Sequence, residues 1–252
     1  MNPSNNIPKI IHYIWFGRGE KTDLIKSCIN KNKEILDDWK FIEWNEDTYD
    51  INSCQYIQEA YEAKKYAFAS DYARFDILYK EGGVYLDTDV EMLKPFADEY
   101  LLAEGFSGVE SNNKIAPGLV FASKAKNPIV KEILEDYQKD IFLMENGAYN
   151  LETVVDRVTR IFKQHGFLIT GDKQELDGFI IYPCEYFCAY DFVLDEFNIT
   201  SKTVSIHHYT ATWVSFKSKI KKKLQKYIRV IFGKNIYLKL ISIKRTIWGE
   251  SK

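Results

Sequence analysis

The sequence predicts an α/β protein whose mixed central sheet has a parallel portion. Strand-like and helix-like segments alternate through the first half of the chain, which is the pattern of repeated βα units. The chain has 252 residues, of which 46% are hydrophobic and 28% are charged. A chain of this length and composition can bury a full core without help from disulfides, and it is not a disordered or collagen-like chain.

The opening segment, residues 8–16, reads PKIIHYIWF and is bounded by Pro8 and Gly17. Its β-branched and aromatic residues favour a strand that is buried on both faces. Helical patterns follow at residues 23–36, 55–65 and 67–80, and a second strand pattern lies at residues 39–44.

The third of these helices is expected to end at Gly82 and Gly83, because glycine readily adopts the left-handed conformation that terminates a helix. A short strand at residues 84–86 comes next, and Asp87 and Asp89 stand at its carboxyl end. Ligands of open α/β sheets bind beyond the carboxyl ends of the strands, so a site is expected there.

The second half of the chain is less regular. Its strand patterns lie at residues 119–122, 178–182 and 202–207. Its helical patterns lie at residues 128–139, 151–164, 220–231 and 237–247. The last two helices are basic and amphipathic, unlike the rest of the chain.

Charge divides the chain into an acidic body and a basic tail. Residues 216–252 contain 12 Lys and Arg against one acid, whereas residues 1–215 contain 22 basic and 35 acidic residues. We therefore place a domain boundary at residue 216. The tail is expected to lie on an anionic membrane surface and not on nucleic acid, because no nucleic-acid recognition motif accompanies the charge. The alternative is that its helices pack on the body and leave their lysines solvated.

Three features of the sequence bear on the cellular compartment of the protein. No apolar run approaches the ~18 residues that a membrane span needs, and residues 1–6 are polar and uncharged, unlike a secretory signal. The four cysteines, Cys28, Cys54, Cys184 and Cys188, do not form a disulfide-dense framework. We expect a cytoplasmic protein, peripheral on the inner face of the plasma membrane if the tail binds lipid.

Asp87 and Asp89 are two residues apart, so on an extended chain their carboxylates point the same way. Such a pair can hold one hard divalent cation, Mn²⁺ or Mg²⁺, which in turn binds a diphosphate. Among 17 Asp, roughly one Asp-x-Asp is expected by chance, so the pair alone fits a solvated loop or a helix cap.

Asp71 and Arg74 are three residues apart on the helix that precedes the pair, and they share a face. One interpretation is an exposed ion pair worth only ~0.3 kcal/mol. The other is a carboxylate and a guanidinium that reach the hydroxyls of a sugar and a phosphate, which suits the planar fork of arginine.

The string AFASDYARFDILYKEGGVYLDTD, residues 67–89, resembles the DxD glycosyltransferases of family 32. That family includes initiating α-mannosyltransferases, bacterial capsular polysaccharide transferases and, more distantly, the large glucosylating toxins. The opening IPKIIHYIWFG is similar to the first strand of the family, and YNLETVV, IYPCEYF and IHHYTATW resemble later blocks of the capsular branch. The resemblance spans residues 7–213, which is the whole acidic body.

The resemblance implies a GT-A fold, with residues 1–215 as its catalytic domain. It also implies that a metal-dependent enzyme transfers a hexose from a nucleotide sugar with retention of anomeric configuration. UDP is favoured over GDP on family analogy. The implied acceptor is a glycan or a lipid-linked glycan in surface polysaccharide synthesis.

Carried over residue by residue, the resemblance implies that Asp87 contacts the ribose and the metal shell and that Asp89 binds the metal directly. Asp71 and Arg74 would hold the donor sugar, with Arg74 also near the phosphate. These four residues form the expected catalytic set. Tyr85 would lie beside the nucleotide.

Aromatic and histidine residues complete the implied site. Trp15 would stack on the base of the donor, with a core position as the alternative. His207 or His208 would contact the metal or the diphosphate, unless the two histidines simply end a strand. Thr212 keeps the hydroxyl of a serine that is frequent in the family, and Trp213 would close over the diphosphate or pack.

Three other interpretations fit parts of the sequence. Zinc could bind Cys184 and Cys188 with the two histidines, but the spacing is unusual and two buried free cysteines are preferred. A metal-dependent phosphohydrolase would need a second metal, and Glu91 is the only further acid close in sequence. A non-enzymatic glycan- or nucleic-acid-binding protein would not need the dense motif at residues 67–89.

Overall fold

The computed structural model describes residues 6–191, 194 and 196–210 of the chain. The chain divides into two compact units, and the central sheet belongs to the first, which comprises residues 1–190 and 197–209. The predicted tail, residues 216–252, lies outside the described residues, as do Thr212 and Trp213. The boundary at residue 216 therefore stays a prediction.

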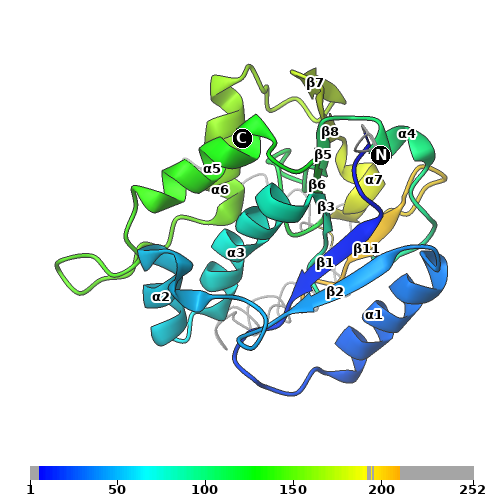
Figure 1. The fold of residues 1–252 in the computed structure, drawn as a ribbon. Helices are drawn as coiled ribbons and strands as arrows, with labels where there is room; N and C mark the ends of the chain where they lie inside the picture. The colour runs from blue at the N-terminus through cyan, green and yellow to red at the C-terminus, as the bar shows by residue number, and fades with distance from the viewer. Residues whose placement is uncertain (1–5, 192–193, 195, 211–252) are drawn as a thin grey trace, which may run out of the picture. The chain divides into compact units, whose positions relative to one another are not determined.

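A mixed sheet of seven strands forms the centre of the first unit, in the order β2-β1-β3-β6-β5-β8-β7 (Figure 1). The pairs β1/β2, β1/β3 and β5/β8 are parallel, and the other three pairs are antiparallel. The strands are β1 (Ile10–Ile14), β2 (Lys40–Trp44), β3 (Gly83–Tyr85), β5 (Gly105–Gly108), β6 (Phe121–Ser123), β7 (Gln174–Leu176) and β8 (Phe179–Tyr182). The predicted mixed α/β class is confirmed.

Helices cover both faces of this sheet (Figure 1). One face packs against α2 (Gln55–Glu62), α3 (Tyr66–Glu81), α5 (Pro128–Gln138) and α6 (Val154–Gln164). The other face packs against a second apolar cluster that includes residues of α4 (Asp98–Leu101), α7 (Cys184–Phe187) and β4 (Val90–Met92). The central strands β3, β5 and β6 are buried on both faces, as expected for a sheet covered on both sides, whereas the edge strands β2 and β7 are partly exposed.

Two glycines, Gly82 and Gly83, allow α3 to end and β3 to begin without a longer loop. Gly82 has φ +67° and donates its N–H to the carbonyl of Leu78, which ends the helix. Gly83 has φ +105°, and a Cβ there would lie 2.8 Å from the carbonyl oxygen of Ile10. Glycine is therefore required for the chain to leave α3 and enter the sheet directly beside β1.

A second, smaller ribbon brings residues 205–207 next to residues 90–92. β11 (Ser205–His207) pairs antiparallel with β4, with Ile206 opposite Glu91 and His207 opposite Val90. Helix α1 (Asp23–Ile35) contacts the same ribbon through β4. Side chains from three distant parts of the sequence therefore lie close to one another.

Several short elements were not predicted from the sequence. These are β4, β5, β7, α4 and α7, the single 3₁₀ turn Ile51–Ser53, and a small ribbon of β9 (Tyr190–Asp191) and β10 (Glu196–Phe197). Helix α6 begins at Val154 and not at residue 151, because Thr153 accepts a hydrogen bond from the Asp156 N–H as its N-cap.

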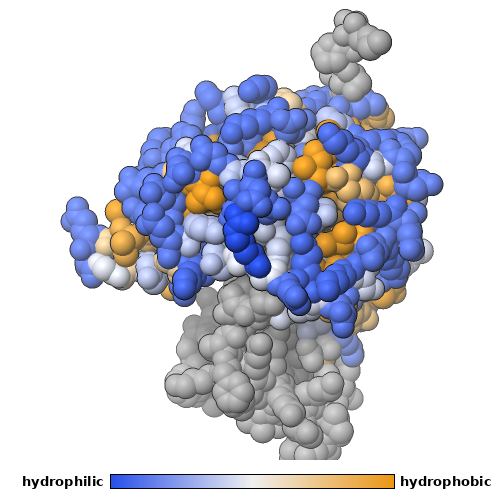
Figure 2. Space-filling model, turned by 60° about the horizontal axis from the view of Figure 1, so that its bottom comes forward, coloured by the Kyte–Doolittle hydropathy of each residue, from blue (hydrophilic) through white to orange (hydrophobic). Residues whose placement is uncertain are grey.

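The face shown in Figure 2 is largely hydrophilic, with hydrophobic residues in separate patches. Within the described ranges, no helix combines the length and the apolar composition that crossing a membrane requires.

Candidate active site

The site forms where β3 ends. Leu86 donates its N–H to the carbonyl of His12, which extends the pairing with β1 by one bond. The chain then turns, because the Val90 N–H donates to the Asp87 carbonyl at 3.0 Å. This turn brings the carboxylates of Asp87 and Asp89 together. The alternation of side chains along an extended strand, on which the sequence argument relied, does not.

Asp87 is held by three neighbours. The Tyr85 hydroxyl donates to its Oδ1 at 2.8 Å, and Arg74 Nη1 lies 3.5 Å from the same oxygen. The Asp87 N–H donates to the Gly118 carbonyl, and a Cβ on Gly118 would lie only 2.2 Å from Oδ2 of Asp87. Gly118 is thus a site residue that sequence reasoning missed, since nothing in its sequence position links it to a residue 31 positions earlier.

Arg74 is buried and does not form the exposed ion pair that was the simpler interpretation. It is 3% exposed and Asp71 is 8% exposed, and Arg74 Nη2 donates to Asp71 Oδ1 at 2.6 Å. The guanidinium also lies over the ring of Tyr85, 4.5 Å from its centroid. Its Nη1 has no hydrogen-bond partner, so the arginine keeps a donor for a ligand.

Burial and neighbouring charges shift the pKa values of Asp71 and Arg74. Burial raises the pKa of Asp71 to about 6, although the charges of Arg74 and Arg157 oppose the change. Burial also acts to lower the pKa of Arg74, but its negative neighbours outweigh it and raise that pKa. At neutral pH Arg74 is charged and Asp71 is largely ionised.

His207 joins the two aspartates from β11. Its Nε2 lies 2.8 Å from Asp89 Oδ1 and 3.9 Å from Asp87 Oδ2. Burial acts to lower the pKa of His207, but the carboxylates of Asp89 and Asp87 raise it above the usual value. One ligand atom from each of the three residues lies within 4.8 Å of the others.

This donor set fits a divalent cation such as Mn²⁺. Two carboxylates and an imidazole are ligands that Mn²⁺ accepts, and the negative charge that raises the pKa of His207 is the charge a cation would neutralise. Mg²⁺ suits the carboxylates but accepts an imidazole less readily.

The two neighbouring histidines have different partners. His208 Nε2 lies 2.7 Å from Glu91 Oε2 and belongs to a separate group with Cys28. The sequence left open which histidine meets the aspartates, and the pairing of β11 with β4 gives His207 that position.

Trp15 follows the carboxyl end of β1, next to β3 in the sheet. Its indole N–H donates to the Gly19 carbonyl at 2.6 Å, and the ammonium of Lys21 lies 5.5 Å from its ring centroid. The side chain is half-buried, so it is neither a full core residue nor wholly free. Its stacking on a base stays a prediction.

The cysteines that suggested zinc are free. Cys188 is buried, as expected, while Cys184 is only half-buried. Cys188 Sγ lies 3.2 Å from the hydroxyl of Tyr209. Neither cysteine joins His207 or His208 in a ligand group within the part of the chain that the structure describes.

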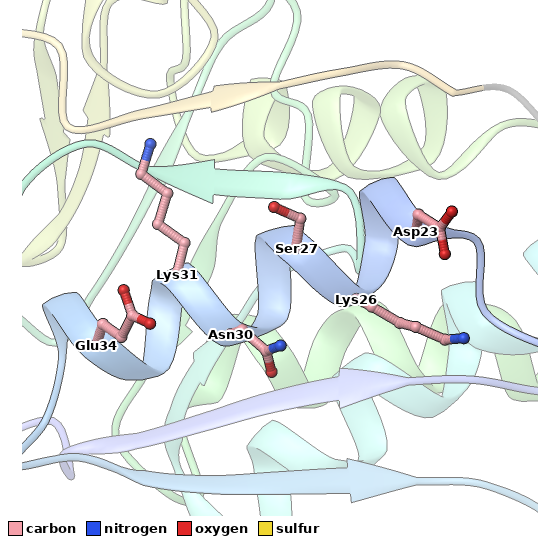
Figure 3. A pocket seen from close by; sticks show the side chains of 6 residues that line it. All are labelled: Asp23, Lys26, Ser27, Asn30, Lys31 and Glu34. Atoms are coloured by element: carbon pink, nitrogen blue, oxygen red, sulfur yellow. The ribbon is translucent and has the colours of Figure 1, made fainter.

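A hollow on the surface is lined only by α1 (Figure 3). Its lining side chains are Asp23, Lys26, Ser27, Asn30, Lys31 and Glu34. They all come from one helix and spread outward from it in Figure 3. We assign no chemistry to this hollow, because it has no converging groups.

A candidate cation site lies beside a buried arginine–aspartate pair at the carboxyl edge of a mixed sheet, and this arrangement suits an anionic ligand. Residues 20–107 match the model of a family described as a glycosyltransferase sugar-binding region containing a DXD motif. Asp71, Arg74, Asp87 and Asp89 all lie within this match.

Named relatives agree with the family match. An uncharacterized glycosyltransferase of Acanthamoeba polyphaga mimivirus is 27% identical over 198 residues, which cover 72% of this chain and 75% of that protein. Inositol phosphoceramide mannosyltransferase 3 of Schizosaccharomyces pombe is 30% identical over 100 residues, covering 35% of this chain and 26% of that protein. A solved structure, the PaToxG glycosyltransferase, has a TM-score of 0.49 and 20% identity over 63% of this chain and 70% of that one.

The chain is a glycosyltransferase with the DXD motif. The matches support the resemblance to DxD glycosyltransferases of the family 32 type. They do not distinguish the capsular branch from the other branches. The mixed seven-stranded sheet with its flanking helices is the α/β architecture that the sequence predicted, and the GT-A type is what the resemblance implies for it.

Proposed function

We propose that this glycosyltransferase moves a hexose from a nucleotide sugar, with UDP favoured, to a glycan or lipid-linked glycan acceptor, and that it retains the anomeric configuration. One observation carries the proposal. The carboxylate of Asp87 joins two groups, since its Oδ1 faces Tyr85 and Arg74 while its Oδ2 faces His207. A cation at the metal side of Asp87 and the guanidinium on its other side could each bind phosphate oxygens of a nucleoside diphosphate.

The metal site would consist of Asp87, Asp89 and His207. When bound there, Mn²⁺ or Mg²⁺ would supply the positive charge that neutralises the departing diphosphate. The residues of the chain fix the geometry, because the Tyr85 hydroxyl donates to the Asp87 carboxylate and the missing Cβ of Gly118 leaves room for it.

Arg74 and Asp71 would act on the donor. Nη1 of Arg74 is buried, lies 3.5 Å from Asp87 Oδ1 and has no hydrogen-bond partner, so it could donate to a phosphate oxygen. Asp71 could accept hydrogen bonds from hydroxyls of the sugar. Asp71 already binds Arg74, which makes it a poor nucleophile. We therefore favour attack of the acceptor hydroxyl from the side that the diphosphate leaves: the bond to the acceptor oxygen forms, the bond to the diphosphate breaks, and a phosphate oxygen takes the proton.

The acceptor and the compartment belong to the same proposal. The name of the yeast relative specifies a mannosyl group and an inositol phosphoceramide acceptor. That name supports a hexose as the transferred sugar and a lipid-linked acceptor. A basic tail bound to an anionic membrane would also support a lipid-linked acceptor. We place the enzyme in the cytoplasm, at the inner face of the plasma membrane, in the synthesis of a surface polysaccharide.

The test is a panel of UDP- and GDP-linked hexoses with Mn²⁺, scored by a luminescent assay for the released nucleotide. We expect one donor to be used and the activity to be lost in Asp89→Asn. Asp38→Asn is the matched control, because this exposed aspartate pairs only with Lys9 on the surface. The configuration of the product, determined by NMR, tests retention. A phosphohydrolase would instead release nucleotide products equally from nucleotides without a sugar.

A further inference from the structure

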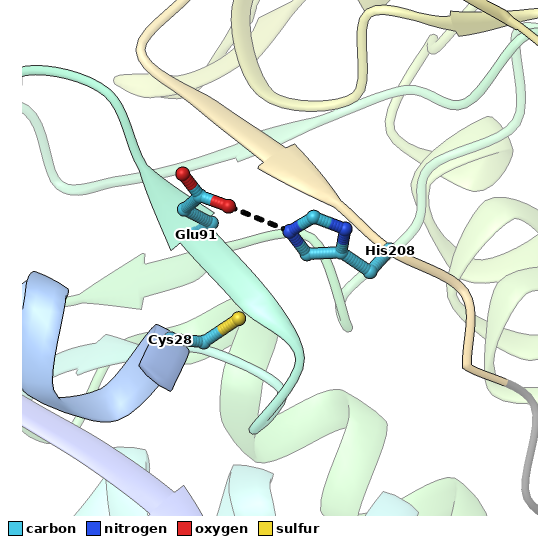
Figure 4. A group of neighbouring side chains, drawn as sticks. All are labelled: Cys28, Glu91 and His208. Carbon is cyan, nitrogen blue, oxygen red and sulfur yellow. Dashed lines mark hydrogen bonds and ion pairs between the residues drawn. The ribbon is translucent and has the colours of Figure 1, made fainter. Parts of the chain in front are cut away.

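Three side chains of different chemistry lie close together near the proposed catalytic site. They are Cys28 on α1, Glu91 on β4 and His208, directly after β11 (Figure 4). One ligand atom from each lies within 4.8 Å of the others, and His208 Nε2 lies 2.7 Å from Glu91 Oε2. The proposed reaction does not use this group.

The fold holds these residues in place. The pairing of β11 with β4 brings both histidines to the start of β4, where His207 Nε2 lies 2.8 Å from Asp89 Oδ1 and His208 Nε2 lies 2.7 Å from Glu91 Oε2. On α1, Asn32 lies one turn after Cys28 and is bound to the first and the last residue of β4. Its amide donates to the Val90 carbonyl at 2.9 Å and accepts from the Met92 N–H at 2.8 Å.

The surroundings favour a cation. Cys28 is 1% exposed, and burial, followed by the carboxylates of Glu91 and Asp89, raises its pKa to about 11. The negative charge that disfavours a thiolate favours a metal ion that replaces the thiol proton. The ammonium of Lys31 pairs with Glu91 Oε1, which leaves Oε2 on the side of His208 and Cys28.

We propose that Cys28, Glu91 and His208 bind a zinc ion at a second metal site, separate from the cation site of Asp87, Asp89 and His207. A thiolate, an imidazole and a carboxylate form a donor set that zinc prefers, whereas Mg²⁺ does not accept a thiolate. Tetrahedral zinc needs donor atoms about 3.3–3.6 Å apart, so small side-chain rotations close the site around the ion.

The zinc would tie α1 to the β4–β11 ribbon. The two sites share no ligand, but Glu91 follows Asp89 by two residues and His208 follows His207 directly. The second ion would therefore fix the ribbon that carries two of the three ligands of the first site.

The experiment uses the full-length protein after removal of metals. Zinc affinity is measured by competition with a chromophoric chelator, and Co²⁺ is added separately as a spectroscopic probe of a thiolate ligand. We expect one tight zinc ion and a thiolate-to-cobalt charge-transfer band. Cys28→Ser should abolish the band, and His208→Gln should weaken zinc binding by at least ~10-fold.

Two variants separate this site from its rivals. Cys184→Ser should keep the band, because Cys184 is outside the group, and Asp89→Asn should keep it because Asp89 belongs to the other site. Lys31→Gln removes the competing ammonium and should strengthen zinc binding by about 2- to 5-fold.

The proposal is overturned if the wild-type protein gives no thiolate band, or if the band persists in Cys28→Ser and disappears in Cys184→Ser. Circular dichroism of the metal-free variants shows whether they are folded. If Cys28→Ser does not fold, Lys31→Gln decides: unchanged or weaker zinc binding in this variant would overturn the proposal.

Discussion

Replacing Arg74 with lysine tests the donor site most directly. Lysine keeps the charge but cannot lie flat over Tyr85 or contact two acceptors at once. In the structure Arg74 reaches Asp71 at 2.6 Å and Asp87 at 3.5 Å, and it stacks on Tyr85 at 4.5 Å. The variant should keep the contact with Asp71 and lose the others.

The size of the effect follows from those contacts. A hydrogen bond to a charged group contributes about 1.5–3 kcal/mol, and a buried cation–π contact contributes about 1 kcal/mol. Their loss in the transition state corresponds to roughly 10²- to 10³-fold in kcat/KM.

The assay is nucleotide release from the donor identified in the panel, at several donor concentrations. Arg160→Lys is the matched control, since Arg160 is 45% exposed and pairs with Asp136 and Glu152 at the surface. We expect that control to change kcat/KM by less than about 2-fold. Thermal melting shows whether each variant is folded. The reasoning is refuted if folded Arg74→Lys is as active as Arg160→Lys.

Four further outcomes are expected. Asp89→Asn should lower transfer by at least ~10²-fold with little change in melting temperature, and full activity with Mn²⁺ would remove the metal from the mechanism. Trp15→Ala should weaken UDP binding by about 1–3 kcal/mol in calorimetry if the ring stacks on the base, whereas normal binding by a less stable protein would identify a packing residue. Because burial raises the pKa of Asp71 to about 6, the folded state binds more protons than the unfolded state between about pH 4 and pH 6, and stability falls as pH rises through that window. In urea titrations Asp71→Asn should lose less stability than the wild type over that window, and parallel curves would contradict the shift. A chain ending at Ser215 should stay in the supernatant with anionic vesicles while the full chain sediments at low salt, and the membrane assignment fails if both stay soluble.

The sequence predicted the elements whose signals are local. The β-branched run of β1, the long helix α3 and the two glycines before β3 each carry their own signal within a few residues, so their predicted bounds agree with the structure to within two residues. Strands β4 and β5 have only three and four residues, which is too short for a period to be recognised.

The arrangement of the candidate site could not be predicted from the sequence. A spacing of three on a helix allowed either an exposed or a buried Asp71–Arg74 pair, and only the packing of α3 against the sheet decides that it is buried. Likewise, the choice between His207 and His208 depends on the register of β11 against β4, which no local pattern encodes. Gly118 became visible only through its distance to Asp87.

The pairing of β11 with β4 also has a consequence for synthesis of the protein. His207 meets Asp89 across 118 residues of sequence, so the contact has a high sequence separation and carries a large loop-closure cost. During translation the two aspartates emerge long before their histidine. We expect the growing chain to fold its sheet first and to complete its cation site last, so that partly made enzyme molecules cannot consume nucleotide sugar.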